Sequence, residues 1–420
     1  MQWQNFNWKK LIAPIIFILV AIGFGLALYY LFFKPTFETP PTEEPQGIEQ
    51  LPDATTGTQP GLTEGEETTG IPELPTKSIT KITAPEKALL PSEIAQGGLT
   101  ATTALSFEKA DKISLDSTGK NPLIYNAQSG EFYSIDENGD KKLLTEKIYK
   151  NIETIALSSD KTKAILEFPD DTNIYFNFEK NKQITLPKEW TEFSFNSTAD
   201  KIAFKNMDND PEQRFLGIAN PDGSGIKYIE SMSTNDDHVE VNWSPNEKVL
   251  AFYKDGDTST TSKLYLLGQY GENFKSITIN GYGANTQWST NGEKLLYSAY
   301  TPYTDNKPLL QIVDTDGENI GANNNSLKVY TWADKCVFAD ATTVYCAVPK
   351  EMPSGAGLVP RLADSVPDYI YKIDLKKGTK SFVAEPDGDY TIDQLQVNSD
   401  QSRLFFTDKH SGAIYQIKLK

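Results

Sequence analysis

The sequence predicts an all-β chain folded as a seven-bladed β-propeller, and two observations support this prediction. One short pattern recurs seven times: an apolar strand ending in a large residue, a polar turn, and a second apolar strand. The large residues, called anchors here, lie 38 to 59 residues apart; they are Leu115, Leu157, Phe195, Trp243, Trp288, Phe338 and Val397. A repeat of this length built from strands is typical of one four-stranded propeller blade.

The first predicted element is a membrane-spanning helix over residues 11–33, which contain no charged side chain. At a rise of about 1.5 Å per residue, this segment is long enough to cross a hydrocarbon core of about 30 Å. A cleaved signal peptide is the alternative, but its apolar core is usually only about 7–15 residues long. Lys9 and Lys10 precede the segment and only Lys34 follows it. The positive-inside rule therefore places residues 1–10 in the cytoplasm and the remainder outside the cell membrane.

Residues 34–100 are predicted to form a disordered linker rich in Pro, Thr and Glu. The segment shows neither a strand nor a helix period, and it has too little apolar area to offset the entropy lost on ordering. We expect it to hold the globular part away from the membrane, with binding of envelope material or glycosylation as the alternative. The propeller domain is then expected over residues 101–420.

Each repeat is expected to supply four strands in chain order. For blades one to three these strands are 112–115, 123–126, 131–135 and 141–144; 152–157, 163–168, 174–178 and 182–186; 191–195, 201–204, 215–219 and 226–229. For blades four and five they are 239–243, 249–253, 263–267 and 274–277; 285–288, 294–299, 309–314 and a weak strand after Asp316-Gly317. For blades six and seven they are 335–339, 343–348, 369–374 and 380–384; 394–397, 403–408 and 413–419.

Blade seven is one strand short, and the segment just before blade one supplies one strand too many. That segment, residues 100–107, contains Ala104, Leu105 and Phe107. We expect it to complete blade seven, because closing the ring leaves no unpaired strand edge between the last blade and the first. Rings of six or eight blades are the alternatives to seven.

Two repeats share a nearly identical stretch, Trp243-Ser244-Pro245-Asn246 and Trp288-Ser289-Thr290-Asn291-Gly292. These stretches resemble the WSPDG element of TolB-like propellers, which are of the WD-repeat type, and Leu250-Ala251-Phe252 resembles the strand that follows it. Further similarity lies in Leu264-Tyr265 and Asp316-Gly317, and the resemblance spans roughly residues 101–420. It implies an extracytoplasmic binding propeller, but the motif is structural and supplies no site residues. We expect both tryptophans to pack between blades.

The composition excludes several classes of function. The net charge is −17, of which residues 101–420 carry −12, because residues 1–100 together carry −5. An acidic surface repels a phosphate backbone, so we expect no nucleic-acid partner. With two His and two Cys in the chain, a Cys/His zinc site and a Ser–His or Cys–His nucleophile are disfavoured. A pair of carboxylates in the channel is the catalytic arrangement that remains open.

We expect no cofactor and no metal ion. The Asp314-x-Asp316-Gly317 stretch begins like a calcium loop but lacks its later ligands, and it falls where a hairpin turn is due. Asp236-Asp237-His238 could form a cation site or a general base, yet a solvated loop is the more usual arrangement in an acidic protein.

Cys336 and Cys346 flank a predicted hairpin whose midpoint is residue 341. Residues placed symmetrically about a hairpin turn lie directly opposite each other on the paired strands, close enough for a disulfide. Two free buried thiols are the alternative, but the expected location outside the cytoplasm favours the bond.

Residues 352–367 interrupt blade six between its second and third strands. Loops of this length inside a compact repeat are often functional or disordered. This one is apolar and holds a cation, so we predict that it contacts a partner through Met352, Leu358, Val359 and Arg361. A local cover over the blade edge is an equal alternative.

Together these features predict a membrane-anchored, extracytoplasmic propeller that is not an enzyme and binds a protein or an envelope glycan. A surface hydrolase that uses acidic residues in the channel is the alternative. An envelope-assembly factor within a larger complex is a third interpretation, suggested by the TolB-like resemblance. The sequence specifies neither the partner nor the oligomeric state.

Overall fold

The computed structural model describes residues 90–256, 260–272 and 274–420. The membrane helix predicted over residues 11–33 and most of the predicted linker lie outside these ranges. In the part of the chain that is described, no helix is long and apolar enough to cross a membrane.

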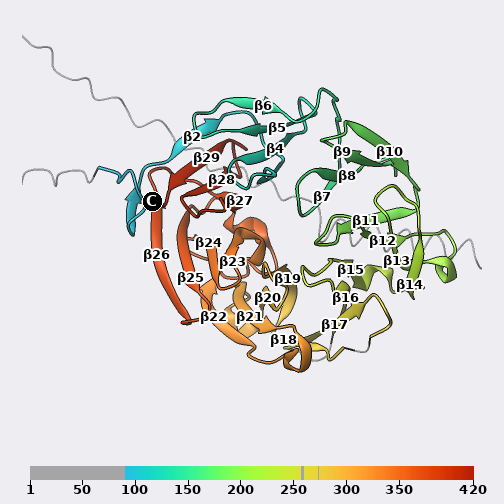
Figure 1. Cartoon of the computed structure of the whole chain (residues 1–420). Helices are drawn as coiled ribbons and strands as arrows, with labels where there is room; N and C mark the ends of the chain where they lie inside the picture. Colours follow the sequence, from blue (N-terminus) through green and yellow to red (C-terminus); the bar gives the residue numbers. More distant parts are fainter. Residues whose placement is uncertain (1–89, 257–259, 273) are drawn as a thin grey trace, which may run out of the picture. The chain divides into compact units, whose positions relative to one another are not determined.

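The described residues form seven β-sheets arranged in a ring (Figure 1), which confirms the predicted seven-bladed, all-β fold. Two pockets lined by residues of the inner strands lie inside the ring, and this space is called the channel here. The first strand of each blade lies nearest the channel, and later strands lie progressively further out. Neighbouring strands within each repeat pair antiparallel, as expected for strands joined by short turns.

Blade one contains β3 (Lys112–Leu115), β4 (Pro122–Asn126), β5 (Glu131–Ile135) and β6 (Lys141–Leu143). Blade two contains β7 (Thr154–Leu157), β8 (Lys163–Glu167), β9 (Asn173–Asn177) and β10 (Lys182–Leu186). Blade three contains β11 (Trp190–Phe195), β12 (Ile202–Asn206), β13 (Phe215–Ala219) and β14 (Lys227–Ser231). Blade four contains β15 (Val239–Val241), β16 (Val249–Gly256), β17 (Ser262–Gly268) and β18 (Ile277–Ile279). Blade five contains β19 (Tyr282–Trp288), β20 (Lys294–Tyr300), β21 (Leu309–Asp314) and β22 (Asn325–Tyr330).

Blades six and seven contain β23 (Cys336–Asp340), β24 (Thr343–Pro349), β25 (Asp368–Asp374) and β26 (Thr379–Pro386); β27 (Ile392–Val397), β28 (Arg403–Asp408) and β29 (Ile414–Lys418). Short 3₁₀ helices occupy the connections: η1 (Pro211–Gln213), η2 (Asp236–His238), η3 (Pro302–Thr304), η4 (Gly317–Asn319), η5 (Ala333–Lys335) and η6 (Pro360–Ala363). The outer strand of blade four was expected at 274–277 and instead begins at Ile277, where alternating burial starts.

The ring closes through the segment that precedes blade one. Strand β2 (Thr103–Ser106) pairs antiparallel with β29 and completes blade seven, as predicted. The linker was expected to extend to residue 100, and this boundary is wrong. Strand β1 (Gly98–Thr100) pairs in parallel with β26 of blade six, and Ile94 forms a bridge with Lys418. The entering chain is thus fixed to two blades, because its backbone completes the outer edge of each.

The turn after the anchor is closed by a side chain in most blades. In five blades a Ser or Asn oxygen accepts the backbone N–H five residues later; the pairs are Ser158–Lys163, Asn196–Lys201, Ser244–Val249, Ser289–Lys294 and Asn398–Arg403. The residue four positions after the anchor is left-handed in six blades, namely Gly119, Lys161, Ala199, Glu247, Gly292 and Gln401. The Trp-Ser-x-Asn stretches are therefore turn motifs, which explains why they recur without forming a site.

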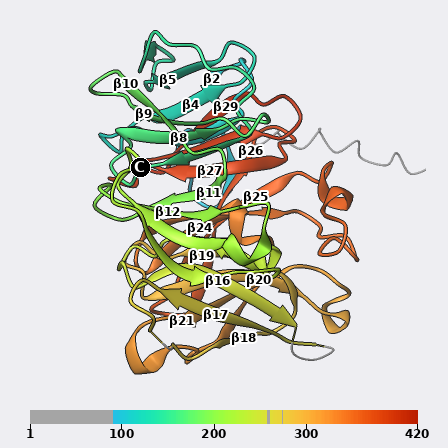
Figure 2. The same cartoon turned by 90° about the vertical axis from the view of Figure 1, so that its right-hand side faces the viewer.

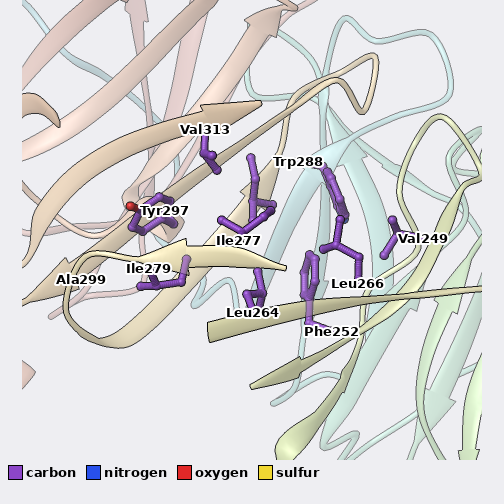
Figure 3. Close-up of a cluster of buried hydrophobic side chains, with 11 residues drawn as sticks. Val249, Phe252, Leu264, Leu266, Ile277, Ile279, Trp288, Tyr297, Ala299 and Val313 are labelled. Atoms are coloured by element: carbon purple, nitrogen blue, oxygen red, sulfur yellow. The ribbon is translucent and has the colours of Figure 1, made fainter. Parts of the chain in front are cut away.

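The core is divided among the contacts between neighbouring blades. Each of seven buried apolar clusters, counted over the described residues, combines side chains from two adjacent blades. Between blades four and five, Trp288 stacks on Phe252 with ring centroids 5.3 Å apart (Figure 3). Trp243 occupies the same place between blades three and four. Both tryptophans therefore pack between blades, as predicted.

The predicted disulfide is present. Cys336 of β23 and Cys346 of β24 lie directly opposite each other in the hairpin, with their Cα atoms 4.0 Å apart and their sulfurs bonded. Both side chains are buried in the cluster between blades five and six. The bond therefore ties the two innermost strands of blade six together.

Candidate binding site at the channel mouth

Acidic side chains recur where the inner strands begin. Six blades carry an acid three or four residues before the anchor, and blade five has Asn285 there. The six acids, called the carboxylate ring here, are Asp111, Glu153, Glu192, Glu240, Asp334 and Asp393. Because the repeats are related by rotation about the channel, equivalent positions lie at a similar height along it.

Lysines neutralise half of the carboxylate ring. The ion pairs are Lys109–Asp111 at 2.7 Å, Lys205–Glu192 at 2.6 Å and Lys254–Glu240. Lys205 and Lys254 come from the second strands of their blades, β12 and β16. Among the described residues, Glu153, Asp334 and Asp393 form no ion pair. The ring therefore retains a net negative charge at the channel.

A pocket of about 630 Å³ opens at this mouth. Part of its lining comes from the inner strands and the residues just before them: Glu240, Asn285, Asp334 and Asp393. Another part comes from the segment between β24 and β25: Gly357, Pro360, Ala363 and Asp364. A second pocket of about 540 Å³ shares Asp334 and Asp393 and extends to Lys112, Lys161 and Gln287. These two aspartates therefore border both the mouth and the adjoining part of the channel.

Two ionisable side chains that line the channel, Asp334 and Lys161, have shifted pKa values. Burial raises the pKa of Asp334, and the nearby Asp393 carboxylate raises it further. Water in the channel still reaches the Asp334 side chain, so the effect comes from the surrounding protein and not from complete enclosure. Burial likewise lowers the pKa of Lys161, and the charge of Lys112 adds to this decrease. Burial therefore disfavours the charged form of both side chains, which line the same pocket.

The segment 350–367, called the insertion here, forms one wall of the mouth. Two glycines fasten it to the neighbouring loop of blade five: the Gly355 N–H donates to the carbonyl of Asp305 at 2.8 Å, and the Gly357 N–H to that of Asn306 at 2.7 Å. A Cβ at Gly357 would lie 2.5 Å from that of Tyr300, so this close approach requires glycine.

The other end of the insertion is fastened to blade seven. Lys409 contacts Asp364 at 2.5 Å, and the Thr391 hydroxyl donates to the Val366 carbonyl at 3.2 Å. In the side view of Figure 2, the orange loop that carries the insertion projects beyond the strands. The insertion therefore crosses one face of the propeller, with fixed contacts on blades five and seven.

The predicted partner-contact residues fall into two groups. Leu358 and Val359 are about half exposed, at 57 % and 50 %, and Arg361 is also exposed. Met352 is only 8 % exposed and packs at the base of the insertion. Sequence reasoning missed Leu362, which is 49 % exposed and lies beside Arg361 on the short helix η6. It also missed the carboxylate ring, although an acid three or four residues before six of the seven anchors was a visible signal.

The other acidic motifs serve the local structure. Lys294 pairs with Asp314 and Lys248 pairs with Asp316, which opens η4. Arg214 contacts Asp236 at 2.8 Å. In the described part of the chain, no cluster of three or more His, Cys, Asp or Glu side chains has the arrangement of a metal site.

Comparisons with known proteins identify the fold. No family model matches the chain, and no curated protein matches it. Among solved structures it is similar to an oligogalacturonate lyase in complex with manganese, with a TM-score of 0.52, 15 % identity, and coverage of 76 % of this chain and 93 % of that chain. It is also similar to the Swd1 β-propeller domain of Myceliophteria thermophila, with a TM-score of 0.48, 10 % identity, and coverage of 76 % and 100 %. The likeness to the oligogalacturonate lyase shows a shared fold alone, and membership of the TolB-like family stays a prediction.

Proposed function

We propose that the chain is a membrane-anchored, extracytoplasmic binding module of the cell envelope, which holds a protein or glycan partner at the channel mouth. The observation that carries this proposal is the exposed apolar side of the insertion, formed by Leu358, Val359 and Leu362. Exposed apolar residues grouped on a segment fastened at both ends are typical of a partner-binding surface, because their fixed geometry lowers the entropy cost of binding. The uncharged segment 11–33 supports the anchor, and the disulfide supports the location.

Site-specific photo-crosslinking in intact cells tests the binding site. A photoreactive residue at position 358 of the full chain is expected to give a defined crosslinked product. The matched control is position 148. Ile148 is 60 % exposed, and it lies between β6 of blade one and β7 of blade two, far from the insertion in the sequence. A product that forms equally at both positions, or at neither, would contradict a partner at the channel mouth.

The topology has its own test. Protease added to cells whose cytoplasmic membrane is intact is expected to remove the propeller domain, with any outer membrane opened first. Full protection of residues 101–420 under these conditions would show that the proposed orientation is wrong.

A hydrolase is the second candidate, and one observation favours it. Asp334 has a raised pKa and shares its pocket with Asp393, and glycosidases use one protonated and one ionised carboxyl group. Incubation of the full chain with envelope polysaccharide, followed by assay of new reducing ends, separates the two candidates. Activity that disappears in Asp334→Asn would support the hydrolase, and its absence in the unmodified chain would reject it.

A further inference from the structure

A second surface lies away from the channel, between the outer parts of blades five and six. It is a groove of about 240 Å³, and its polar lining consists of three lysines and three tyrosines: Lys328, Lys350, Lys380, Tyr330, Tyr369 and Tyr371. Lys328 and Tyr330 come from β22 of blade five, whereas the tyrosines of β25 and Lys380 of β26 come from blade six. None of the residues that line this groove is acidic.

Contacts between lysines and tyrosine rings organise the groove. The Lys350 ammonium lies 5.2 Å from the centroid of the Tyr369 ring, and the Lys380 ammonium lies 6.0 Å from that of Tyr371. Lys380 also donates to the Lys328 carbonyl at 3.0 Å, which connects the two blades. Attraction between an ammonium and an aromatic face keeps each charge near the groove without neutralising it.

The charge of the groove contrasts with that of the whole domain. Residues 101–420 carry a net charge of −12, so most of the surface repels anions. Within the groove, Lys350 has a carboxylate partner, Glu385 at 2.8 Å, whereas Lys328 and Lys380 form no ion pair among the described residues. An anionic ligand would therefore be attracted to this groove and repelled by the surface around it.

We infer that this groove binds a segment of an anionic polysaccharide. The face of a pyranose ring is rich in C–H groups and covers the apolar face of an aromatic side chain, while the tyrosine hydroxyl supplies a hydrogen bond at the ring edge. Carboxylates on successive sugars would be held by the lysine ammoniums. Tyr330 is 41 % exposed, so its ring is accessible to such a ligand.

An acidic peptide is disfavoured by the shape of the neighbouring strand. An extended peptide usually binds by adding a strand to a free sheet edge. Lys328 lies in the middle of β22 with a φ of 55°, and the register between β21 and β22 shifts between Leu309 and Gln311. Such an irregular edge is a poor template for strand addition. The inference concerns a site separate from the channel mouth and does not depend on the proposed function.

The test measures binding of labelled oligosaccharides to the full chain by fluorescence anisotropy. The probes are an alginate oligomer, which is a linear polyuronate, a neutral pullulan oligomer of equal length, and a poly-glutamate oligomer of equal charge. We expect the alginate oligomer to bind most tightly of the three. The variant Lys328→Glu with Lys380→Glu should weaken alginate binding about tenfold, because two favourable charge contacts become repulsive.

The control is Lys142→Glu with Lys376→Glu, which makes the same change in net charge at two exposed lysines outside the groove. Alginate binding should be unchanged in this control, whereas Tyr330→Ala should weaken it while leaving the melting temperature unaltered. If the groove variant fails to fold, Tyr330→Ala takes its place. The inference is overturned if alginate does not bind, if the control loses as much affinity as the groove variant, or if poly-glutamate or pullulan binds as tightly.

Discussion

Lys335 donates to both carboxylate oxygens of Asp368, at 2.8 and 2.7 Å, and the Asp368 side chain is fully buried. Asp368 begins β25, where the insertion ends, and it also accepts the backbone N–H of Ile392 in blade seven at 2.7 Å. Lys335 ends η5 and lines the pocket at the channel mouth. This ion pair therefore joins the inner edge of blade six, the base of the insertion and blade seven.

Removing one partner of this pair should destabilise the domain strongly. Asp368→Asn leaves the Lys335 ammonium buried without its counter-charge, and such a change typically costs about 3–5 kcal/mol. Replacing both, Lys335→Met with Asp368→Asn, should cost much less, because no uncompensated charge remains. Equilibrium unfolding in denaturant of the two variants and the parent chain measures both values. A loss below about 1 kcal/mol in Asp368→Asn would mean that water reaches the pair and replaces the lost contact.

Two turn glycines with similar backbone conformations should differ in how well they tolerate an added side chain. Gly292 has a φ of 69°, and a Cβ there would lie 2.7 Å from the backbone nitrogen of Asn246 in blade four. Gly292→Ala should therefore lose about 2–3 kcal/mol of stability, from backbone strain together with the clash. Gly378 has a similar φ of 65° but no atom near its would-be Cβ. Gly378→Ala should lose only about 1 kcal/mol. Equal losses in thermal unfolding would show that the contact between blades relaxes without cost.

The charge of Asp334 should make the stability of the domain depend on pH. Its pKa is raised in the folded chain, so the folded state is more stable when Asp334 is protonated than when it is ionised. The resulting stability is present below the unfolded pKa of about 3.9 and is lost as the pH rises through the folded value. Asp334→Asn should therefore raise the melting temperature at neutral pH, and this gain should vanish near pH 3.5. The control is Asp237→Asn, an exposed carboxylate outside the channel. A gain that persists unchanged in acid would exclude the electrostatic explanation.

Local features could be predicted from the sequence where the residues that determine them lie within one repeat or at equivalent places in two repeats. The Cys336–Cys346 pair follows from symmetry about a single hairpin, and Trp243 and Trp288 follow from their equivalent places in two repeats. The end of the linker was misplaced because Gly98–Thr100 has no strand-like alternation, and its pairing with β26 depends on a distant part of the chain.

The sites were less predictable, because they combine residues from different blades. Tyr330 and Tyr369 belong to separate repeats, and only the packing of two blades places them in one groove. Asp334 and Asp393 are likewise unremarkable acids in the sequence until the ring brings them to one pocket. Met352 was expected on the surface as part of an apolar loop, yet it supports the base of that loop.

Closure of the ring by β2 should depend on one side chain. Leu105 is 8 % exposed and packs with Ile113, Ile135 and Phe405 between blades seven and one, whereas Phe107, two residues on, is 81 % exposed. Leu105→Ala should cost about 2–4 kcal/mol, from lost apolar burial and the cavity left behind. Phe107→Ala removes a larger side chain from the same segment and should change stability by less than about 0.5 kcal/mol. Denaturant unfolding of both variants measures the difference. If Leu105→Ala were as harmless as Phe107→Ala, the N-terminal strand would contribute nothing to closure, and the domain would have to be held by the other contacts between blades.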